Sequence, residues 1–165
     1  MDNYMKLEIA ALGENEAFAR SAVAAFALTL NPTLAELSDI KTAVSEAVTN
    51  CIVHAYGGAN TNQKIRIECE TVYEEIENPL FKERKGRIHI RITDYGCGID
   101  DVEKALQPFF TTREGDERSG MGFTIMQTFM EDFSIQSKRG LGTVVTMSKS
   151  IGNTENFMIK ERANA

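Results

Sequence analysis

The chain has 165 residues, of which 42% are hydrophobic, and this size and composition suit one domain with an ordinary core. The formal net charge is -6 and the 18 lysines and arginines are scattered, which argues against a nucleic-acid-binding protein. The sequence opens without a signal-peptide pattern and holds no apolar run that could span a bilayer, so we expect a cytoplasmic protein without a membrane partner. Three cysteines without CxxC spacing argue against a disulfide framework and a zinc site.

The first half of the chain predicts one strand followed by two helices. Residues 6–12 alternate weakly between apolar and polar side chains and suit an edge strand. The alanine-rich stretch 14–30 has a high helix propensity. A capping-box pattern, Thr33 with Glu36, then opens a second helix whose apolar spacing continues to Tyr56.

After the second predicted helix, four segments alternate between apolar and polar side chains in the manner of strands. They are residues 64–73, 87–93, 133–139 and 143–149. The charged segment 74–86, which contains a proline, is interpreted as a protruding loop between the first two of them. A short helix is predicted over 101–107, a flexible polar stretch over 107–119 and a longer helix over 122–132.

This order of elements predicts an α+β fold. Strands that follow one another through short links favour a mostly antiparallel sheet, and the helices then cover one face of it in a two-layer α/β sandwich. We expect a single domain over residues 1–151 and a disordered tail over residues 152–165.

Two polar side chains interrupt the apolar pattern of the second predicted helix. Glu46 and Asn50 are four residues apart and therefore lie on one face, a turn from each other. A solvated helix face would explain them in structural terms. A functional explanation is also open, because a carboxylate can accept a proton and a carboxamide oxygen can bind a hard cation.

Three glycine sites occur where a backbone could approach a ligand. They are Asp94-Tyr95-Gly96-Cys97-Gly98-Ile99 after a predicted strand, Gly120-Met121-Gly122 before a predicted helix, and Gly142-Thr143 at the start of the last strand. Each alone suits a tight turn. A glycine pair at a helix start can also aim free N–H groups at a phosphate. Neither the P-loop pattern nor the dinucleotide-binding pattern is present in the sequence.

The polar pair, the DxGxG after a strand, the GxG at a helix start and the Gly-Thr follow one another in the order of the four boxes of the GHKL superfamily, which the chain resembles. The resemblance implies the Bergerat ATP-binding fold of that superfamily. Within it, three phrases resemble the anti-sigma F family of serine-protein kinases: NEAFAR (15–20), DIKTAVSEAVTN (39–50) and ERSGMGFTIM (117–126).

The resemblance implies ATP and Mg²⁺ as cofactors and assigns roles to the polar residues. Asn50 would supply one oxygen to Mg²⁺, whose other ligands are waters and phosphates, and Glu46 would be the general base that accepts the proton of an attacking hydroxyl. Asp94 would accept a hydrogen bond from the adenine amino group, which favours adenine over guanine, and Thr143 would support this contact, either directly or through a water.

The remaining site residues follow from the same resemblance. Gly96 and Gly98 would keep the strand end thin beneath the base, with Ile99 as an apolar wall. Residues at the helix start would bind the phosphates with backbone groups: Ser119, Gly120, Met121, Gly122 and Phe123. Arg118 would meet the γ-phosphate, and Thr111 and Thr112 would close over the nucleotide as a lid.

The implied partners are proteins. The family resemblance predicts a sigma factor of the sigma F type, held in the ATP-bound state, an anti-anti-sigma protein phosphorylated on serine, and a homodimer. Arg20 matches the family's partner-contacting arginine, although a solvated helix position would explain it equally well.

Other interpretations stay open at this point: an anti-sigma B type of stress-response kinase, a nucleotide-dependent binding module without turnover, and a detached histidine-kinase catalytic domain. Neither His54 nor His89 lies where a histidine kinase carries its phosphoacceptor.

Overall fold

The computed structural model describes residues 3–77, 82–108 and 120–151, with residues 74–77 and 82–84 described as backbone alone. The strands are β1 (Asn3–Ala11), β2 (Asn60–Glu77), β3 (Lys82–Thr93), β4 (Asp132–Lys138) and β5 (Gly142–Ile151). The helices are α1 (Gly13–Ala27), α2 (Leu34–Asn50), α3 (Val102–Ala105) and α4 (Gly122–Phe129). A 3-10 turn, η1 (Leu28–Leu30), follows α1, and a π-helical turn, η2 (Cys51–Ala55), follows α2.

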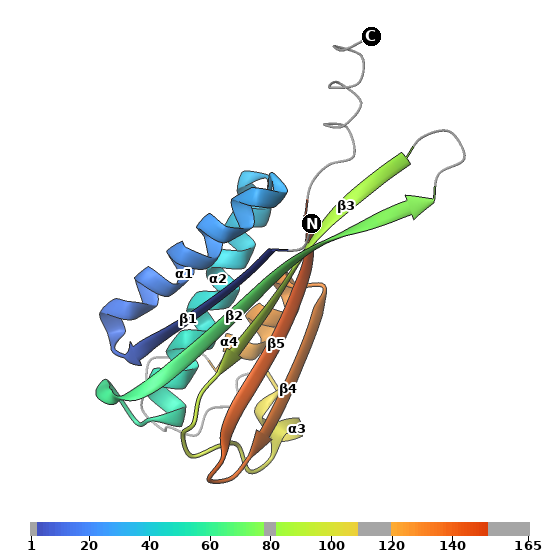
Figure 1. Ribbon diagram of the computed structural model, residues 1–165. Coiled ribbons are helices and arrows are strands. Elements are labelled where there is room, and N and C mark those ends of the chain that lie inside the picture. Colours follow the sequence, from blue (N-terminus) through green and yellow to red (C-terminus); the bar gives the residue numbers. More distant parts are fainter. Residues whose placement is uncertain (1–2, 78–81, 109–119, 152–165) are drawn as a thin grey trace.

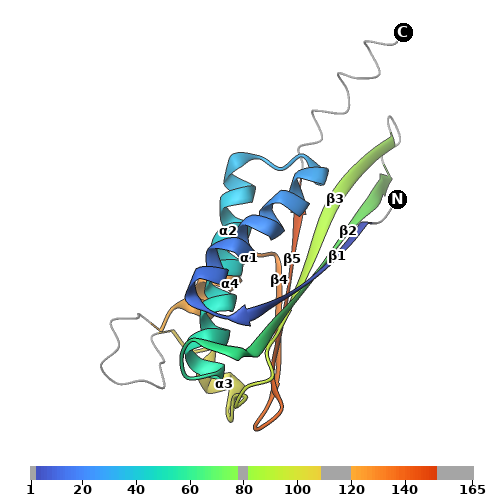
Figure 2. The ribbon, with the colours of Figure 1, turned by 60° about the vertical axis from the view of Figure 1, so that its left-hand side comes forward.

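The five strands form one sheet in the order β1-β2-β3-β5-β4, and every neighbouring pair is antiparallel. Helices α1, α2 and α4 lie together on one face of this sheet, as the two views of the ribbon show (Figures 1 and 2). The predicted α+β sandwich with a mostly antiparallel sheet is therefore confirmed.

The core lies between the sheet and the helices. Alternate residues of the central strand β3, namely Ile88, Ile90 and Ile92, are almost completely buried, and so are Ile65 and Ile67 of β2. The side chains between them along each strand are polar and face the other side of the sheet, which none of the described helices covers (Figure 2). This period of two is what a sheet with one buried face requires.

Helix α2 begins with the capping box that the sequence predicts. The Thr33 hydroxyl accepts a hydrogen bond from Glu36 N (3.2 Å), and Thr33 N donates to Glu36 Oε2 (2.7 Å). The buried stripe of α2 includes Val44 and Val48, which face the sheet. The predicted helix runs on to Tyr56, whereas the α-helical hydrogen bonds end at Asn50 and the wider turn η2 takes over.

The prediction of a loop over residues 74–86 is wrong. Strands β2 and β3 continue through most of this segment as a hairpin that extends past the rest of the sheet (Figure 1). The register sets Glu74, Glu75 and Glu77 opposite Lys85, Arg84 and Lys82. The backbone pairing of β2 with β3 therefore continues beyond the part of the sheet that the helices cover.

Several predicted boundaries shift by a few residues. Strand β1 begins at Asn3 rather than residue 6, and α4 ends at Phe129 because the next strand already begins at Asp132. Residues 152–165, predicted as a disordered tail, lie outside the described residues. In the described part of the chain, no helix combines the length and apolarity that a membrane crossing needs.

Candidate functional site

The polar pair on α2 lies directly against the glycine that opens α4. Glu46 and Asn50 are both half-buried on the face of α2 that packs on α4. A methyl group at Gly122 would come within 3.1 Å of Glu46 Oε2 and 3.2 Å of Asn50 Nδ2. The structure therefore brings together two of the sequence-predicted groups, the polar pair and the GxG, and glycine leaves the space in which they meet.

The start of α4 presents backbone N–H groups to this space. Met121 is the N-cap, and the first helical hydrogen bond runs from Ile125 N to Met121 O (2.8 Å). The N–H groups of Gly122, Phe123 and Thr124 precede that bond, as in the first turn of any helix, and they suit a bound anion. Gly120 has a positive φ of 63°, which turns the chain into the helix.

Phe123 anchors the start of α4 with its side chain. Its ring lies 6.1 Å from the ring of Phe133 on β4, tilted by 55°. Such tilted aromatic pairs stabilise packing beyond their buried area. The aromatic side chain thus faces the core, so any ligand contact from this residue comes from its backbone.

Asp94 forms the second part of the site, immediately after β3. Its side chain is 4% exposed, and Oδ1 accepts hydrogen bonds from Gly96 N (2.9 Å) and Thr143 N (3.2 Å). Burial raises the pKa of the Asp94 carboxyl above its usual value, against the lowering effect of the Gly96 and Thr143 N–H groups and the Cys51 thiol. The backbone N–H of Thr143 thus bonds the Asp94 carboxylate directly.

Close backbone packing surrounds Asp94. A methyl group at Gly96 would lie 2.3 Å from Ala55 O, and one at Gly98 would lie 2.2 Å from Lys138 O. Gly98 also has a positive φ of 73°. Both glycines are therefore required where the loop after β3 passes between η2 and the β4–β5 turn, because a side chain would meet the backbone of these neighbours. Ile99 follows at the same edge, with its N–H bonded to Ser137 Oγ (2.8 Å).

Sequence reasoning missed three residues around Asp94. Ser137 links the Ile99 N–H with the Thr143 hydroxyl, which lies 2.9 Å from Ser137 Oγ. Ser137 occupies an inward-facing position of β4, in line with Phe133 and Ile135. A polar residue at a position where the alternation predicts an apolar one is a signal that the sequence offers. The other two, Cys51 and Tyr56, lie in and after η2, and a π-helical turn leaves no distinct pattern in a single sequence.

Cys51 and Tyr56 border the loop that carries Asp94. Burial, and then the negative charge of Asp94, raise the pKa of Cys51 well above its usual value, so the thiol stays protonated. The Tyr56 hydroxyl accepts from Tyr95 N (2.8 Å) and donates to Lys64 O (2.5 Å). Burial is also the largest cause that raises the pKa of Tyr56 to about 12, which keeps this hydroxyl a donor.

Comparison with known proteins decides the family. Residues 9–149 match the model of the histidine kinase-like ATPase domain. The anti-sigma F factor of Caldanaerobacter subterraneus subsp. tengcongensis is 50% identical over 151 residues, which cover 92% of this chain and 96% of that protein. The chain belongs to the anti-sigma F factor family. The anti-sigma F factor of Pasteuria penetrans is 46% identical over 157 residues, or 95% of this chain and 97% of that relative.

The resemblance to the GHKL superfamily that the sequence suggests is thereby confirmed for this member of the anti-sigma F family. As an ATPase-type domain it is expected to bind ATP. Among solved structures, the mycobacterial sensor histidine kinase MprB aligns with a TM-score of 0.47 at 18% identity, over 70% of this chain and 72% of that chain.

Four of the predicted nucleotide-binding residues of this anti-sigma F family member lie outside the described residues. They are Thr111, Thr112, Arg118 and Ser119. The rest fall into two neighbouring groups, one around Glu46, Asn50 and Gly122 and one around Asp94 and Thr143. The turn η2 joins the groups, because it begins at the residue after Asn50 and contacts the loop after β3.

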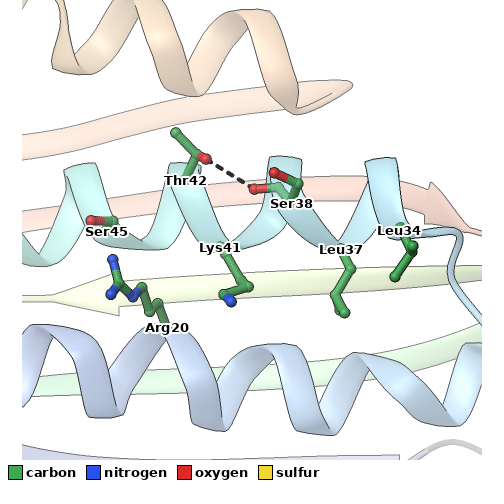
Figure 3. Close-up of a pocket in the computed structure, with 7 residues that line it drawn as sticks. All are labelled: Arg20, Leu34, Leu37, Ser38, Lys41, Thr42 and Ser45. Atoms are coloured by element: carbon green, nitrogen blue, oxygen red, sulfur yellow. Dashed lines mark hydrogen bonds between the residues drawn. The ribbon is translucent and has the colours of Figure 1, made fainter.

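Arg20 lies apart from these groups, on α1. Its guanidinium is 3.6 Å from Glu16 Oε1 and points toward Ser45 of α2 in a surface pocket of about 570 Å³ (Figure 3). The pocket is lined by Arg20, Leu34, Leu37, Ser38, Lys41, Thr42 and Ser45. By the period of the helix, Leu34, Ser38 and Thr42 lie in the same i, i+4 row as Glu46 and Asn50, on earlier turns, whereas Leu37, Lys41 and Ser45 lie to one side of that row.

Proposed function

We propose that this anti-sigma F family member inhibits a sporulation sigma factor of the sigma F type and phosphorylates the anti-anti-sigma antagonist of that factor on serine, with Mg-ATP as phosphoryl donor. The observation that carries the proposal is the meeting of Glu46, Asn50 and Gly122 at the start of α4. A base, a metal-binding oxygen and a row of backbone donors in one place are the parts that phosphoryl transfer needs.

The described residues fit a magnesium-bound triphosphate. Asn50 would contribute its amide oxygen to Mg²⁺, a cation that binds oxygen ligands and is completed by waters and phosphates. The N–H groups of Gly122 and Phe123, with Gly120 and Met121 shaping the turn before them, would bind phosphate oxygens. Bound Mg-ATP would supply the phosphoryl group that is transferred.

The base of the nucleotide would lie beside the loop after β3. Asp94 would accept the hydrogen bond of the adenine amino group, supported by the Thr143 N–H that bonds the same carboxylate. Gly96 and Gly98 would keep the backbone flat there, and Ile99 would pack on the base. A guanine base has no donor at the corresponding position, so adenine is the preferred base.

Glu46 would act on the protein substrate. Its carboxylate lies one helical turn before Asn50 and faces the start of α4, where the terminal phosphate would be held. From there it would accept the proton of the attacking serine hydroxyl at a carboxylate oxygen. We include Arg118 as a contact of the γ-phosphate, Ser119 as a phosphate contact, and Thr111 with Thr112 as part of a lid over the nucleotide.

Partner binding is assigned to the pocket between α1 and α2. It combines two positive side chains, Arg20 and Lys41, with two apolar ones, Leu34 and Leu37, and Leu34 is 87% exposed (Figure 3). Such a mixture suits a protein partner that brings both acidic and apolar side chains. We place a contact with the sigma factor or its antagonist here, through Arg20, and propose that the protein works as a homodimer.

The test uses Mg²⁺, labelled ATP and the purified anti-anti-sigma protein. We expect label on a serine of that protein, whereas label on histidine, or tight ATP-dependent binding without label, would contradict the proposed kinase. Glu46→Gln should keep ATP binding and lower transfer by about 10²–10⁴-fold, the usual contribution of a general base. Asn50→Ala should instead weaken Mg-ATP binding itself, which calorimetry measures. Transfer at the original rate in Glu46→Gln would remove Glu46 from the mechanism.

A further inference from the structure

A row of polar side chains crosses three neighbouring strands at one end of the sheet. Asp94 directly follows β3, and it exchanges backbone hydrogen bonds (3.0 and 3.3 Å) with Thr143 of β5. Ser137 of β4 is in turn the register partner of Thr143. Because side chains alternate along a strand, all three point to the face that the helices cover, where the next row is apolar: Ile92, Val145 and Ile135. Polar groups in such a place need hydrogen-bond partners.

The Ser137 hydroxyl joins three backbone and side-chain groups of the site. Its Oγ accepts a hydrogen bond from Ile99 N (2.8 Å), donates to Gly142 O (3.0 Å) and lies 2.9 Å from Thr143 Oγ1. A hydroxyl has one proton and two acceptor lone pairs. Since the Gly142 carbonyl can only accept, it takes the Ser137 proton. All three contacts are then satisfied only if Thr143 donates its own proton to Ser137.

We propose that Ser137 is a positioning residue that determines base specificity: it takes up the proton of the Thr143 hydroxyl, so that Thr143 offers only acceptor lone pairs to the base of the nucleotide. The neighbouring Asp94 carboxylate, when ionised, also only accepts. Two adjacent acceptors select a base edge that donates, and the 6-amino group of adenine is such a donor. This inference rests on the adenine site proposed above. Ser137 itself touches no nucleotide and acts through Thr143.

The inference predicts an effect confined to the 6-amino group. ATP and purine riboside 5′-triphosphate differ only in that group, and both retain the phosphates that α4 would bind. In Ser137→Ala, the Thr143 proton loses its acceptor and can turn toward the base, where it opposes the amino group. The preference for ATP over the purine analogue should therefore fall by about 3- to 10-fold, the value of one hydrogen bond. Ser137→Thr, which keeps a hydroxyl at this position, should retain the preference.

A double-mutant cycle tests the route through Thr143. Thr143→Val removes the same hydroxyl with little change of volume, and it should lower the preference by a similar factor. Adding Ser137→Ala to Thr143→Val should lower the preference no further, because the two residues act as one unit. Ser134→Ala is the matched control: Ser134 also belongs to β4, but it is exposed on the opposite face of the sheet. It should leave the preference unchanged.

Calorimetry measures the dissociation constants of both nucleotides for the full-length protein and each variant, and thermal melting shows whether each variant folds. Equal weakening of both nucleotides by Ser137→Ala would mean a purely structural role and overturn the inference. A loss of preference in Ser137→Thr as large as in Ser137→Ala would do the same. If Ser137→Ala does not fold, Thr143→Val decides: a lowered preference supports the inference and an unchanged one overturns it.

These outcomes are separate from those of the proposed function. If the wild-type protein binds neither nucleotide, the proposed function fails. Binding of ATP with a preference that Ser137 does not affect leaves the proposed function standing without this inference.

Discussion

At Gly122, a hydrogen atom in place of a side chain decides how close α4 comes to Glu46 and Asn50. A methyl group there would be 3.1 Å from one side chain and 3.2 Å from the other, closer than ordinary van der Waals contact. Both side chains are polar and half-buried, and they would have to move away from the start of α4. The geometry of the candidate site therefore depends on this glycine, whereas the fold does not.

Gly122→Ala should weaken ATP binding by about tenfold and lower phosphotransfer further, because it displaces the proposed base and metal-binding groups. The free energy of unfolding should change by less than about 1 kcal/mol, since alanine has a higher helix propensity than glycine and this gain offsets the crowding. Calorimetry with Mg-ATP and urea unfolding measure the two effects.

Gly13→Ala is a matched control for that variant. Gly13 is also the first residue of its helix, α1, and a methyl group there would meet no atom within 4 Å. It should leave both ATP binding and phosphotransfer unchanged. Unaltered nucleotide binding in Gly122→Ala would contradict the position that we assign to the phosphates.

Among individual residues, the sequence predicted those whose side chains differ in chemistry from the pattern around them. Glu46 and Asn50 interrupt an apolar helix, and Asp94 precedes a glycine pair, so each could be found from its neighbours. Cys51 and Tyr56 could not, because a cysteine and a tyrosine at the end of a helix are ordinary core residues in any sequence. Their roles depend on the wide turn η2, which only the three-dimensional structure shows.

Among the elements, α2, α4 and β5 are joined by one lysine. Lys149 of β5 reaches from the sheet to the helices, where its Nζ lies 3.1 Å from Asp39 Oδ2 on α2 and donates to Phe129 O at the end of α4 (2.8 Å). A positive charge at the last carbonyls of a helix is favourable. Because α2 and α4 carry the two halves of the Glu46–Gly122 contact, this lysine helps to fix their relative position.

Lys149→Met should lower the free energy of unfolding by about 1–3 kcal/mol, because the Lys149 side chain is only 14% exposed and the change removes its ion pair with Asp39 and its hydrogen bond to Phe129 O. Urea unfolding measures this loss. ATP affinity should fall as well, through the shifted helices.

Lys6→Met serves as the comparison for Lys149→Met. Lys6 forms an ion pair with Glu68 at 3.7 Å, but its side chain is 49% exposed. Exposed pairs contribute little, so this variant should stay within about 0.5 kcal/mol of the wild type. A loss as small in Lys149→Met would show that the lysine does not hold the helices.

The elements were predicted well where periodicity is strong. The three isoleucines of β3 and the capping box of α2 locate a strand and a helix without ambiguity. The β2–β3 hairpin was missed because residues 74–77 and 82–85 carry charges on both faces, a pattern that usually indicates a loop. The register that pairs these residues across the two strands is known only from the three-dimensional structure.

For the molecule as a whole, the face of the sheet that the described helices leave uncovered carries a charged network around Arg87. The carboxylates of this network have pKa values that differ from their usual ones. The Arg87 guanidinium donates to Ser150 Oγ (3.0 Å) and Ser148 Oγ (2.9 Å) and pairs with Glu131 and Asp132. The Ser148 hydroxyl, and then Arg87, hold the pKa of Asp132 below its usual value. Partial burial opposes this at Glu131, yet Ser150 and Arg87 lower the pKa of that carboxyl too.

These two carboxylates should contribute to acid unfolding. Since their pKa values are lower in the folded protein than in the unfolded chain, the unfolded chain binds more protons as the pH falls. Their stabilising effect is complete above the usual carboxyl pKa values and is lost from about pH 5 down to about pH 3. In Arg87→Met, the free energy of unfolding should depend less steeply on pH over this interval.

Urea unfolding at a series of pH values checks this expectation. Arg91→Met is the control, because Arg91 lies four residues further along β3 on the same face and is exposed. Its pH dependence should match that of the wild type. Identical slopes for Arg87→Met and the wild type would mean that the network does not link protonation to folding.

The position of β5 also has a consequence for protein synthesis. Of the described strands, β5 is the last to be translated, yet it lies between β3 and β4 in the sheet and supplies the Thr143 N–H that bonds Asp94. A nascent chain therefore carries Glu46, Asn50 and Asp94 before the strand that completes their surroundings has been made. A messenger cut short before β5 would yield a fragment whose β4 has lost its partner among the described strands, and we expect such a fragment to bind no ATP.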